Sequence, residues 1–370
     1  MTPARSALPP IDHARRTLAA TAHVRDGDGP DAALVTDLAD VRWLTGFTGS
    51  NGWAVVRADE VVLGTDLRYR ERAADECAGA DVRIVAEQQP AELRARLLEA
   101  LAGARAVALD PSRTTHAAWT DLAADVVLAP TPSFVRRERE VKDDAEVARI
   151  AAAARAADAA LAEVESMLLG TVDEPVTEAD VRRELEHRMR LHGADDRSYD
   201  TIVASGPRHA ARPHHEASHR VIVEGDTVIV DVGALVDGYH SDMTRSWVVG
   251  EPDAGQRELL ELVAASQRAG LDALRDGVSA RSVDAACRAV FDEAGCGDRF
   301  LHGTGHGVGL EIHETPFAAR TSDDAIRAGN VVTVEPGLYR DGVGGVRIED
   351  LALVTETGHR VLTHAPQRAR

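Results

Sequence analysis

A predicted β-hairpin in the segment TVIVDVGALVDGYHSDMTRSW, residues 227–247, restricts the folds open to this chain more than any other stretch. Asp237 and Gly238 stand between two apolar-rich runs, and Asp-Gly in that setting is the strongest short-range signal for a two-residue turn. Such a turn sets position 236 opposite 239, 233 opposite 242 and 231 opposite 244. Asp231 and Asp242 then lie on one face as diagonal neighbours, about 7 Å apart, and one or two cations can fill that gap.

Two more acidic residues interrupt apolar strands further along the chain. Glu335 ends VVTVEPG and Glu349 interrupts VRIEDLALV, which together predict a second hairpin. Taken alone, Asp231 and Asp242 fit solvated strand residues equally well, but an unpaired carboxylate is costly to bury, and the repetition favours a site. Four carboxylates and one imidazole would neutralise two divalent cations, and this oxygen-rich set suits Mn²⁺, Co²⁺ or Fe²⁺ better than a structural zinc. Two adjacent metals activate water and polarise carbonyls, so the pattern predicts hydrolysis.

The charge balance and the cysteines exclude several other classes of protein. With 61 acidic and 42 basic residues the net charge is −19, which disfavours binding to nucleic acid because that needs clustered cations. Three scattered cysteines predict buried, reduced thiols in a cytoplasmic protein rather than a disulfide framework. The N-terminus lacks the apolar core of a signal peptide, and no stretch approaches 18 apolar residues, so neither export nor a membrane span is expected.

The order of predicted elements indicates two domains. Residues 31–135 alternate strand-like and helical runs, which is typical of a small α/β domain. The proline-containing segment APTPSFVRRERE, residues 129–140, is interpreted as a linker. Helices are predicted over about 140–169, from Thr177 to Gly193, and over about 253–275 and 280–295, among hairpin-linked strands. The predicted domains are therefore 1–135 and 136–370, the second of α+β class.

Five motifs in a fixed order carry a family resemblance: DVG (231–233), SDMTR (241–245), HGTGHGVG (302–309), EPG (335–337) and RIED (347–350). Together they resemble the pita-bread metallopeptidases, which include Xaa-Pro aminopeptidases, Xaa-Pro dipeptidases (prolidases) and methionine aminopeptidases. Upstream, DVRWLTGFTGSNG (40–52) and TDLRYRERA (65–73) resemble the non-catalytic N-terminal domain of the Xaa-Pro enzymes, which methionine aminopeptidases lack. The resemblance implies a C-terminal pita-bread domain and a smaller, creatinase-like α/β N-terminal domain.

The resemblance also implies roles for individual residues. The implied metal ligands are Asp231, Asp242, His306, Glu335 and Glu349, with Asp242 and Glu349 touching both metals. Glu335 doubles as general base, His214 and His313 act at the scissile bond, and His302, Tyr339 and Arg347 surround the substrate and the metals. The loop SGPRHAARPHHE is one residue longer than the family pattern. We assign its substrate histidine to His214, which follows the proline, and interpret His209 and His215 as surface imidazoles.

An Xaa-Pro bond has no amide N–H and a fixed φ, so general peptidases bind it poorly and a dedicated site is needed. The predicted function is an Xaa-Pro aminopeptidase that uses two divalent ions, with Mn²⁺ favoured over Co²⁺, Fe²⁺ and Zn²⁺, on peptides with proline in second position. A prolidase is the alternative. A catalytically inactive binding protein and a metal-free amidinohydrolase of the creatinase type are weaker alternatives. The family resemblance also implies a homodimer.

Overall fold

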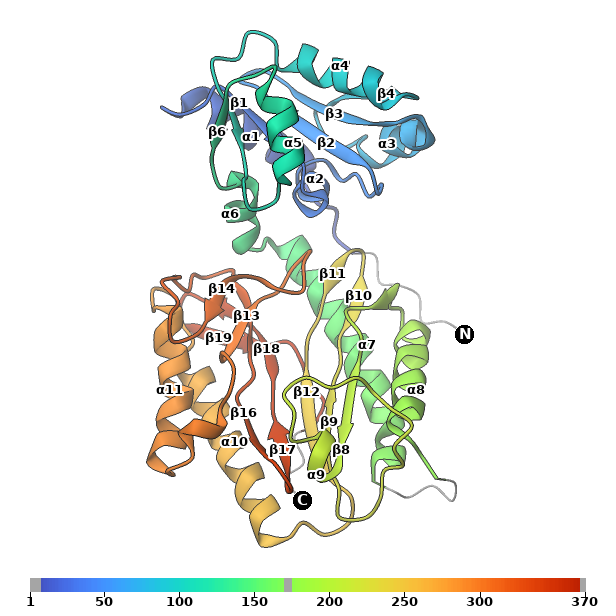
Figure 1. Ribbon diagram of the computed structural model, residues 1–370, viewed down its shortest axis with the longest axis vertical. Helices are drawn as coiled ribbons and strands as arrows, with labels where there is room; N and C mark the ends of the chain where they lie inside the picture. The colour runs from blue at the N-terminus through green and yellow to red at the C-terminus, as the bar shows by residue number, and fades with distance from the viewer. Residues whose placement is uncertain (1–7, 170–174, 367–370) are drawn as a thin grey trace. The chain divides into compact units, whose positions relative to one another are not determined.

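The computed structural model describes residues 8–169 and 175–366. The chain forms two compact units, one of Pro10–Arg139 and a larger one from Glu140 onward that also includes Pro9 (Figure 1). Within the described ranges, no helix combines the length and the apolar character needed to cross a bilayer.

The smaller unit is an α/β layer structure built on a mixed sheet with strand order β4-β3-β2-β1-β5-β6. Its strands are β1 Ala32–Val35, β2 Gly52–Val56, β3 Val61–Asp66, β4 Arg83–Glu87, β5 Val107–Leu109 and β6 Leu128–Pro130. Its helices are α1 His13–Asp26, α2 Leu38–Thr45, α3 Arg70–Glu76, α4 Pro90–Ala100, α5 His116–Ala123 and α6 Phe134–Glu140. Side chains such as Leu34, Val62 and Leu109 fill the core between the sheet and its helices.

The predicted linker at 129–140 is wrong. This segment completes edge strand β6 and then forms helix α6. A proline is tolerated at a sheet edge, where the missing N–H breaks no ladder bond. The charged run after it is not solvated throughout, because Arg139 is 1% exposed and its Nη1 lies 2.6 Å from Oδ1 of Asp40.

The larger unit contains two helix pairs with strands between them (Figure 1). The helices are α7 Asp144–Leu168, α8 Glu178–Leu191, α10 Ala254–Ala273 and α11 Ala280–Glu293, with short α9 at Gly206–His209. The predicted start at Thr177 is confirmed, since its side chain and Asp180 form a reciprocal capping box. One core packs α7 and α8 against strands within residues 202–236, and another packs α10 and α11 against strands within residues 331–355.

The first predicted hairpin has the expected register. Strands β9 Thr227–Asp231 and β12 Thr244–Val248 pair with Asp231 opposite Thr244, and β10 Ala234–Val236 and β11 Tyr239–His240 pair with Val236 opposite Tyr239. Asp237 and Gly238 have φ values of +46° and +73°, as a two-residue turn of this kind requires. Strand β8 Ile202–Ser205 lies beside β9, and β7 Asp196–Arg197 beside β10.

The second predicted hairpin is divided into two paired regions. Strands β16 Gly337–Arg340 and β17 Gly344–Arg347 form its tip, while β15 Val331–Val334 pairs with β18 Asp350–Thr355. Glu335 and Glu349 both lie in the irregular step between the two regions. The remaining strands are β13 Gly305–Gly307, β14 Glu314–Ala318 and β19 Gly358–Val361. The step leaves both glutamates outside the ladders, free to turn toward one site.

Candidate metal centre

The structure brings the five predicted ligands together, four from the two hairpins and His306 from strand β13, residues 305–307. Ligand atoms of Asp242, His306 and Glu349 all lie within 4.8 Å of one another. Asp231 joins them because the Tyr199 hydroxyl contacts both Asp231 and Asp242. Glu335 joins them through Oε1, which lies 3.6 Å from Nε2 of His306. Side chains more than 110 positions apart in sequence therefore surround one candidate metal site.

His306 presents a ring nitrogen to the carboxylates. Its Nδ1 lies 3.0 Å from the Gly307 carbonyl oxygen, which fixes the proton on Nδ1 and leaves the lone pair on Nε2. That Nε2 lies 3.5 Å from Oδ2 of Asp242 and 3.6 Å from Oε1 of Glu335. These separations exceed a normal hydrogen bond but suit atoms that share a cation.

The carboxylates strongly perturb one another. Burial, followed by the charges of neighbouring acids, raises the pKa of Asp242 and of Glu349 well above their usual values. Burial also raises the pKa of Glu335 to about 8, although Arg347 opposes this and Asp231 adds to it. Burial, with His313 nearby, lowers the pKa of His306 to about 4, so its imidazole is neutral at pH 7. Such a group of acids is stable in ionised form only with cations among them.

Glycines flank His306 because other backbone segments approach closely. A Cβ on Gly305 would lie 2.0 Å from the Thr333 carbonyl oxygen, and one on Gly307 would lie 2.4 Å from that of Thr315. Both distances are far below van der Waals contact. The glycine-rich motif therefore lets β13 pass between β14 and β15 and present His306 to the centre.

Arg347 organises the side of the site next to Asp231. Its guanidinium is 3% exposed and lies 2.6 Å from Oδ2 of Asp231. Its Nη1 donates to the Tyr339 hydroxyl at 2.8 Å, and that hydroxyl lies 2.9 Å from Nε2 of His302. With Nδ1 of His302 2.8 Å from the Gly303 carbonyl, Tyr339 donates to Nε2. The three predicted substrate-side residues thus form one directed hydrogen-bond chain.

A pocket of about 410 Å³ opens onto the centre. Its walls include Asp231, His306, Glu335 and Arg347 from the metal side, together with His214, His302, His313, Ile202 and Phe317. His313 packs edge-on against His306, with ring centroids 4.4 Å apart. His214 and His313 are both exposed, as residues at the mouth of a pocket are. The pocket therefore combines polar and apolar walls of the kind that bind small molecules.

The turn that carries His313 is anchored by the chain's only lysine. Lys142 Nζ lies 3.1 Å from Oε2 of Glu314, and the two side chains are 1% and 4% exposed. The other oxygen of Glu314 accepts from the backbone N–H of Glu311 at 3.0 Å. This buried pair holds the end of the glycine-histidine motif in place.

Sequence reasoning missed three polar residues of the site. Tyr199 contacts Asp231 and Asp242, Thr244 donates to Oε2 of Glu349 at 2.7 Å, and Thr333 accepts from the His306 N–H at 3.0 Å. The two threonines are common strand residues at strand positions, so nothing marks them out. Tyr199 lies in a loop with no periodic pattern, and only tertiary contact identifies it.

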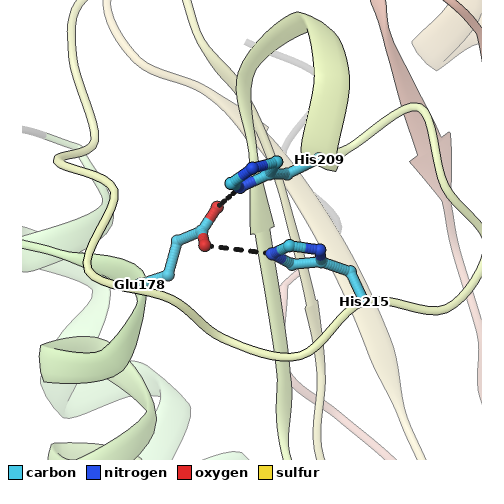
Figure 2. A group of neighbouring side chains, drawn as sticks. All are labelled: Glu178, His209 and His215. Carbon is cyan, nitrogen blue, oxygen red and sulfur yellow. Dashed lines mark hydrogen bonds and ion pairs between the residues drawn. The ribbon is translucent and has the colours of Figure 1, made fainter.

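The interpretation of His209 and His215 as surface imidazoles is wrong. The two rings stack with centroids 4.1 Å apart, and their side chains are 23% and 9% exposed. His209 Nδ1 lies 3.0 Å from Oε1 of Glu178, and His215 Nε2 lies 3.1 Å from Oε2 (Figure 2). Glu178 has no exposed surface, because helix α8 places this charged residue inward beneath the loop. Glu178 of helix α8 therefore holds the loop that carries His214 in place.

Glu178 gives the metal-free protein a predictable sensitivity to acid. Burial alone would raise its pKa, but hydrogen bonds from Ser218, Ser205, His209 and His215 outweigh burial and lower the pKa to about 2. A carboxyl whose pKa is lower in the folded than in the unfolded state stabilises the fold above its usual value, here 4.5. That stabilisation is lost as the pH falls from about 4.5 toward 2. Glu178→Gln should lower the urea midpoint at pH 6 and flatten its decline in acid, measured with chelator present.

The matched control is Glu216→Gln, which changes an exposed acid in the same loop. We expect its pH profile to follow that of the unmodified protein. An equally steep acid decline in Glu178→Gln would contradict the assignment of this sensitivity to Glu178.

Comparison with known proteins agrees with the fold. Residues 148–356 match the model of metallopeptidase family M24, and residues 22–141 match the creatinase/prolidase N-terminal domain. The uncharacterized peptidase YqhT of Bacillus subtilis is 38% identical over 92% of this chain and 95% of its own.

Solved structures show the same two-domain architecture. An Xaa-Pro dipeptidase from Bacillus anthracis superposes with a TM-score of 0.88 at 35% identity, covering 96% of this chain and 98% of the other. An X-Pro aminopeptidase from Thermotoga maritima gives 0.82 at 31% identity, covering 92% and 97%. The pita-bread fold and the creatinase-like N-terminal domain are therefore confirmed. With its ligand types, its fold and both domain matches in agreement, the chain belongs to metallopeptidase family M24.

Proposed function

We propose that this peptidase hydrolyses the bond between a first residue and a following proline, using two divalent cations held by Asp231, Asp242, His306, Glu335 and Glu349. The observation that carries the proposal is the convergence of four carboxylates and one neutral imidazole beside a pocket of about 410 Å³. Family membership makes divalent metal the expected partner of such residues.

The donor set fits two divalent ions. Four carboxylates carry four formal negative charges, which two such ions balance. Arg347 forms an ion pair with Oδ2 of Asp231. Four oxygen donors and one nitrogen favour Mn²⁺ over metals that prefer sulfur or several imidazoles. When bound, such ions lower the pKa of water and polarise a carbonyl oxygen.

The protein's own groups would then position the substrate and move protons. Glu335 lies at the pocket wall, and the family resemblance implies the role of general base for this glutamate, so we assign it that role. His214 and His313 at the mouth would hold the scissile peptide. His302 accepts from Tyr339, which orients its ring beside the space assigned to the proline ring. Burial lowers the pKa of His302 to about 4, so the ring is neutral at pH 7.

Relatives support a proline-directed substrate. The relatives from Bacillus anthracis, Pyrococcus horikoshii and Pyrococcus furiosus are described as Xaa-Pro dipeptidases or prolidases, and the one from Thermotoga maritima as an X-Pro aminopeptidase. Dipeptidases are the more frequent among them, so we place Xaa-Pro dipeptides first and longer Xaa-Pro peptides second. This reverses the order of preference drawn from the sequence.

A substrate panel tests the proposal. The full chain is loaded with Mn²⁺ and given Xaa-Pro dipeptides, Xaa-Pro-Xaa tripeptides and matched Xaa-Ala controls. Release of proline from dipeptides alone supports a prolidase, and cleavage of the tripeptides as well supports an aminopeptidase. Cleavage of the alanine controls only, or of none of the peptides, would refute the proposed specificity.

Adding divalent metal should stabilise the chelator-treated protein, and more so at pH 8 than at pH 5. Metal must displace protons from carboxyls whose pKa values are raised in the metal-free fold, so its binding weakens as the pH falls. In the metal-free protein these same groups favour folding below their usual pKa values and lose that effect as the pH rises toward 8. Thermal midpoints measured with and without Mn²⁺ at both pH values test this. A rise in midpoint on adding Mn²⁺ that is equal at pH 5 and pH 8 would contradict it.

A homodimer and a cytoplasmic location stay predictions.

A further inference from the structure

We propose that Glu178, His209 and His215 form a second metal site, separate from the carboxylate centre, that binds a transition metal of the Zn²⁺ type. The three donor atoms all lie within 4.8 Å of one another. They come from helix α8, from short α9 and from the loop that follows it, and Figure 2 shows both rings turned toward the same carboxylate. We call these three residues the Glu178 cluster.

The geometry around the carboxylate suits a shared cation. The nitrogen–oxygen distances of 3.0 and 3.1 Å are those of hydrogen bonds, and they are only slightly shorter than the roughly 3.3 Å between neighbouring ligands of a tetrahedral zinc ion. The imidazoles stack, so their nitrogens approach Glu178 side by side rather than from opposite directions. A single ion can therefore reach all three groups with small movements of the side chains.

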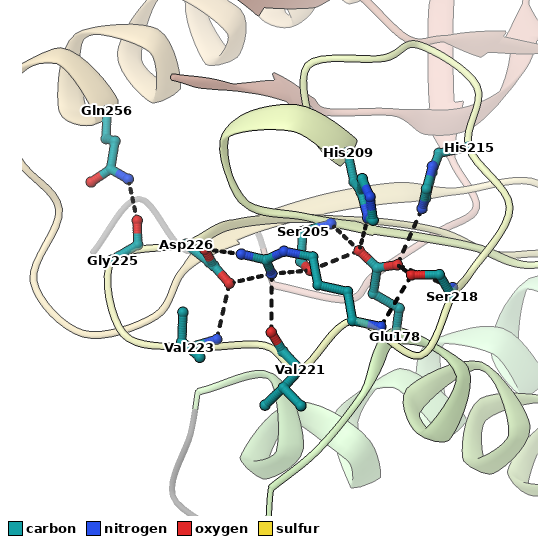
Figure 3. Close-up of polar contacts among 11 residues, drawn as sticks. Glu178, Ser205, His209, His215, Ser218, Val221, Val223, Gly225, Asp226 and Gln256 are labelled. Atoms are coloured by element: carbon teal, nitrogen blue, oxygen red, sulfur yellow. Dashed lines mark hydrogen bonds and ion pairs between the residues drawn. The ribbon is translucent and has the colours of Figure 1, made fainter. Parts of the chain in front are cut away.

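Four serine donors hold the carboxylate in place. Ser205 donates its N–H at 2.8 Å and its hydroxyl at 2.7 Å to Oε1, and Ser218 donates the same two groups to Oε2 at 3.0 and 2.6 Å (Figure 3). The two imidazole nitrogens approach the same two oxygens as further partners. A cation bound through imidazole lone pairs would take the place of the imidazole N–H groups on these oxygens.

The serines provide what a metal-binding carboxylate needs around it. Metal ligands are held in orientation by hydrogen bonds from surrounding groups, and here four such bonds fix the glutamate. Ser205 is itself held by Nη1 of Arg220 at 2.6 Å, and Arg220 pairs with Asp226. One carboxylate oxygen with two imidazoles is a common zinc donor set.

The two sites should select different metals. The cluster offers two nitrogens and one carboxylate, whereas the centre near His306 offers one nitrogen and four carboxylates. Imidazole-rich sites favour Zn²⁺, Co²⁺ and Ni²⁺, and carboxylate-rich sites favour Mn²⁺. His209 is 23% exposed, so an ion can enter from its side and keep a water as a further ligand.

Occupation of the cluster would brace one wall of the pocket. His214 immediately precedes His215, and the Pro213 carbonyl accepts from Nη1 of Arg347 at 2.9 Å. The loop that contains both residues is thus tied to α8 on one side and to the carboxylate centre on the other. A metal at the cluster therefore acts as a structural clamp on the loop, without touching the substrate.

Metal titration of the full chain tests the proposal. The background is Asp242→Asn with Glu349→Gln, which disables the proposed two-metal centre and leaves the cluster intact. After treatment with chelator, this protein is titrated with Zn²⁺ calorimetrically and with Co²⁺, whose visible absorption reports nitrogen ligands. We expect one saturable equivalent of either ion. Adding His209→Gln and His215→Gln should remove that equivalent, because the amides keep an N–H donor for Glu178 but have no imidazole lone pair.

His219→Ala is the matched control, since His219 is exposed in the same loop, and it should retain the full equivalent. If the four-site variant does not fold, the two glutamine substitutions alone, in the otherwise unmodified chain, should lower the zinc content by one equivalent. Unchanged zinc stoichiometry without His209 and His215 would overturn the proposal and leave a hydrogen-bonded clamp. The proposed peptidase function does not enter this test, because it is measured separately by Mn²⁺-dependent cleavage.

Discussion

Asp242→Asn and Glu349→Gln should each reduce Mn²⁺-dependent cleavage of Xaa-Pro substrates to the background rate. Each change removes one negative charge and replaces one carboxylate oxygen with an amide nitrogen that cannot bind metal, in a buried centre where Asp242 and Glu349 are 5% and 1% exposed. The amides are close in shape to the acids, so the loss would reflect charge and ligation rather than packing. Rates are measured with saturating Mn²⁺, and metal content is measured on the same samples.

Thr244→Val is the graded comparison for these two variants. Its hydroxyl donates to Glu349 at 2.7 Å and accepts from Nε of Arg347 at 3.1 Å, but it is not a proposed ligand. Removing such a supporting hydrogen bond typically costs about 10–100-fold in metal affinity or activity. Valine keeps the strand shape. Full activity in Asp242→Asn and Glu349→Gln, with normal metal content, would refute the assigned ligand set.

Lys142→Met should cause a large loss of stability. The Lys142 ammonium and the Glu314 carboxylate are almost fully buried and 3.1 Å apart. Removing one partner of a buried ion pair costs about 3–5 kcal/mol, because the other charge stays desolvated without compensation. Methionine fills nearly the same volume, so the effect should come from the charge. Urea unfolding at neutral pH measures the change in free energy.

Two controls separate this charge effect from other causes. Arg96→Met breaks a pair with Glu99 whose side chains are 51% and 69% exposed, and such surface pairs contribute about 0–1 kcal/mol. Lys142→Met combined with Glu314→Gln removes both charges and keeps an acceptor for the Glu311 N–H, so it should recover part of the lost stability. A double variant as unstable as the single one would show that the buried charge is not the cause.

Much of the carboxylate centre follows from local sequence rules. The Asp237-Gly238 turn sets the register that puts Asp231 opposite Thr244, because a two-residue turn leaves no freedom in strand pairing. Acids inside apolar strands mark Glu335 and Glu349 for the same physical reason, namely the cost of burying a charge without a partner. The capping box at Thr177 is equally local, and it places α8 correctly.

Other features depend on contacts between distant segments. The segment interpreted as a linker, residues 129–140, ends in helix α6, whose Arg139 pairs with Asp40 almost 100 residues earlier. Likewise, His209 and His215 read as loop residues, yet the chain brings them onto Glu178, more than 30 positions before them. Nothing in the neighbourhood of any of these residues encodes its partner.

By itself, the sequence determined the hairpin register, the main helices, the polar outliers in apolar strands and, through the order of five motifs, the family of the chain. Those features depend on turn geometry, capping and periodicity, which act over a few residues. Only the tertiary structure decided that Tyr199 contacts Asp231 and Asp242, that Lys142 anchors the turn of His313, and that a buried glutamate gathers two histidines beneath the pocket loop. These contacts join segments far apart in sequence, and their partners are selected by burial and charge compensation in the folded core.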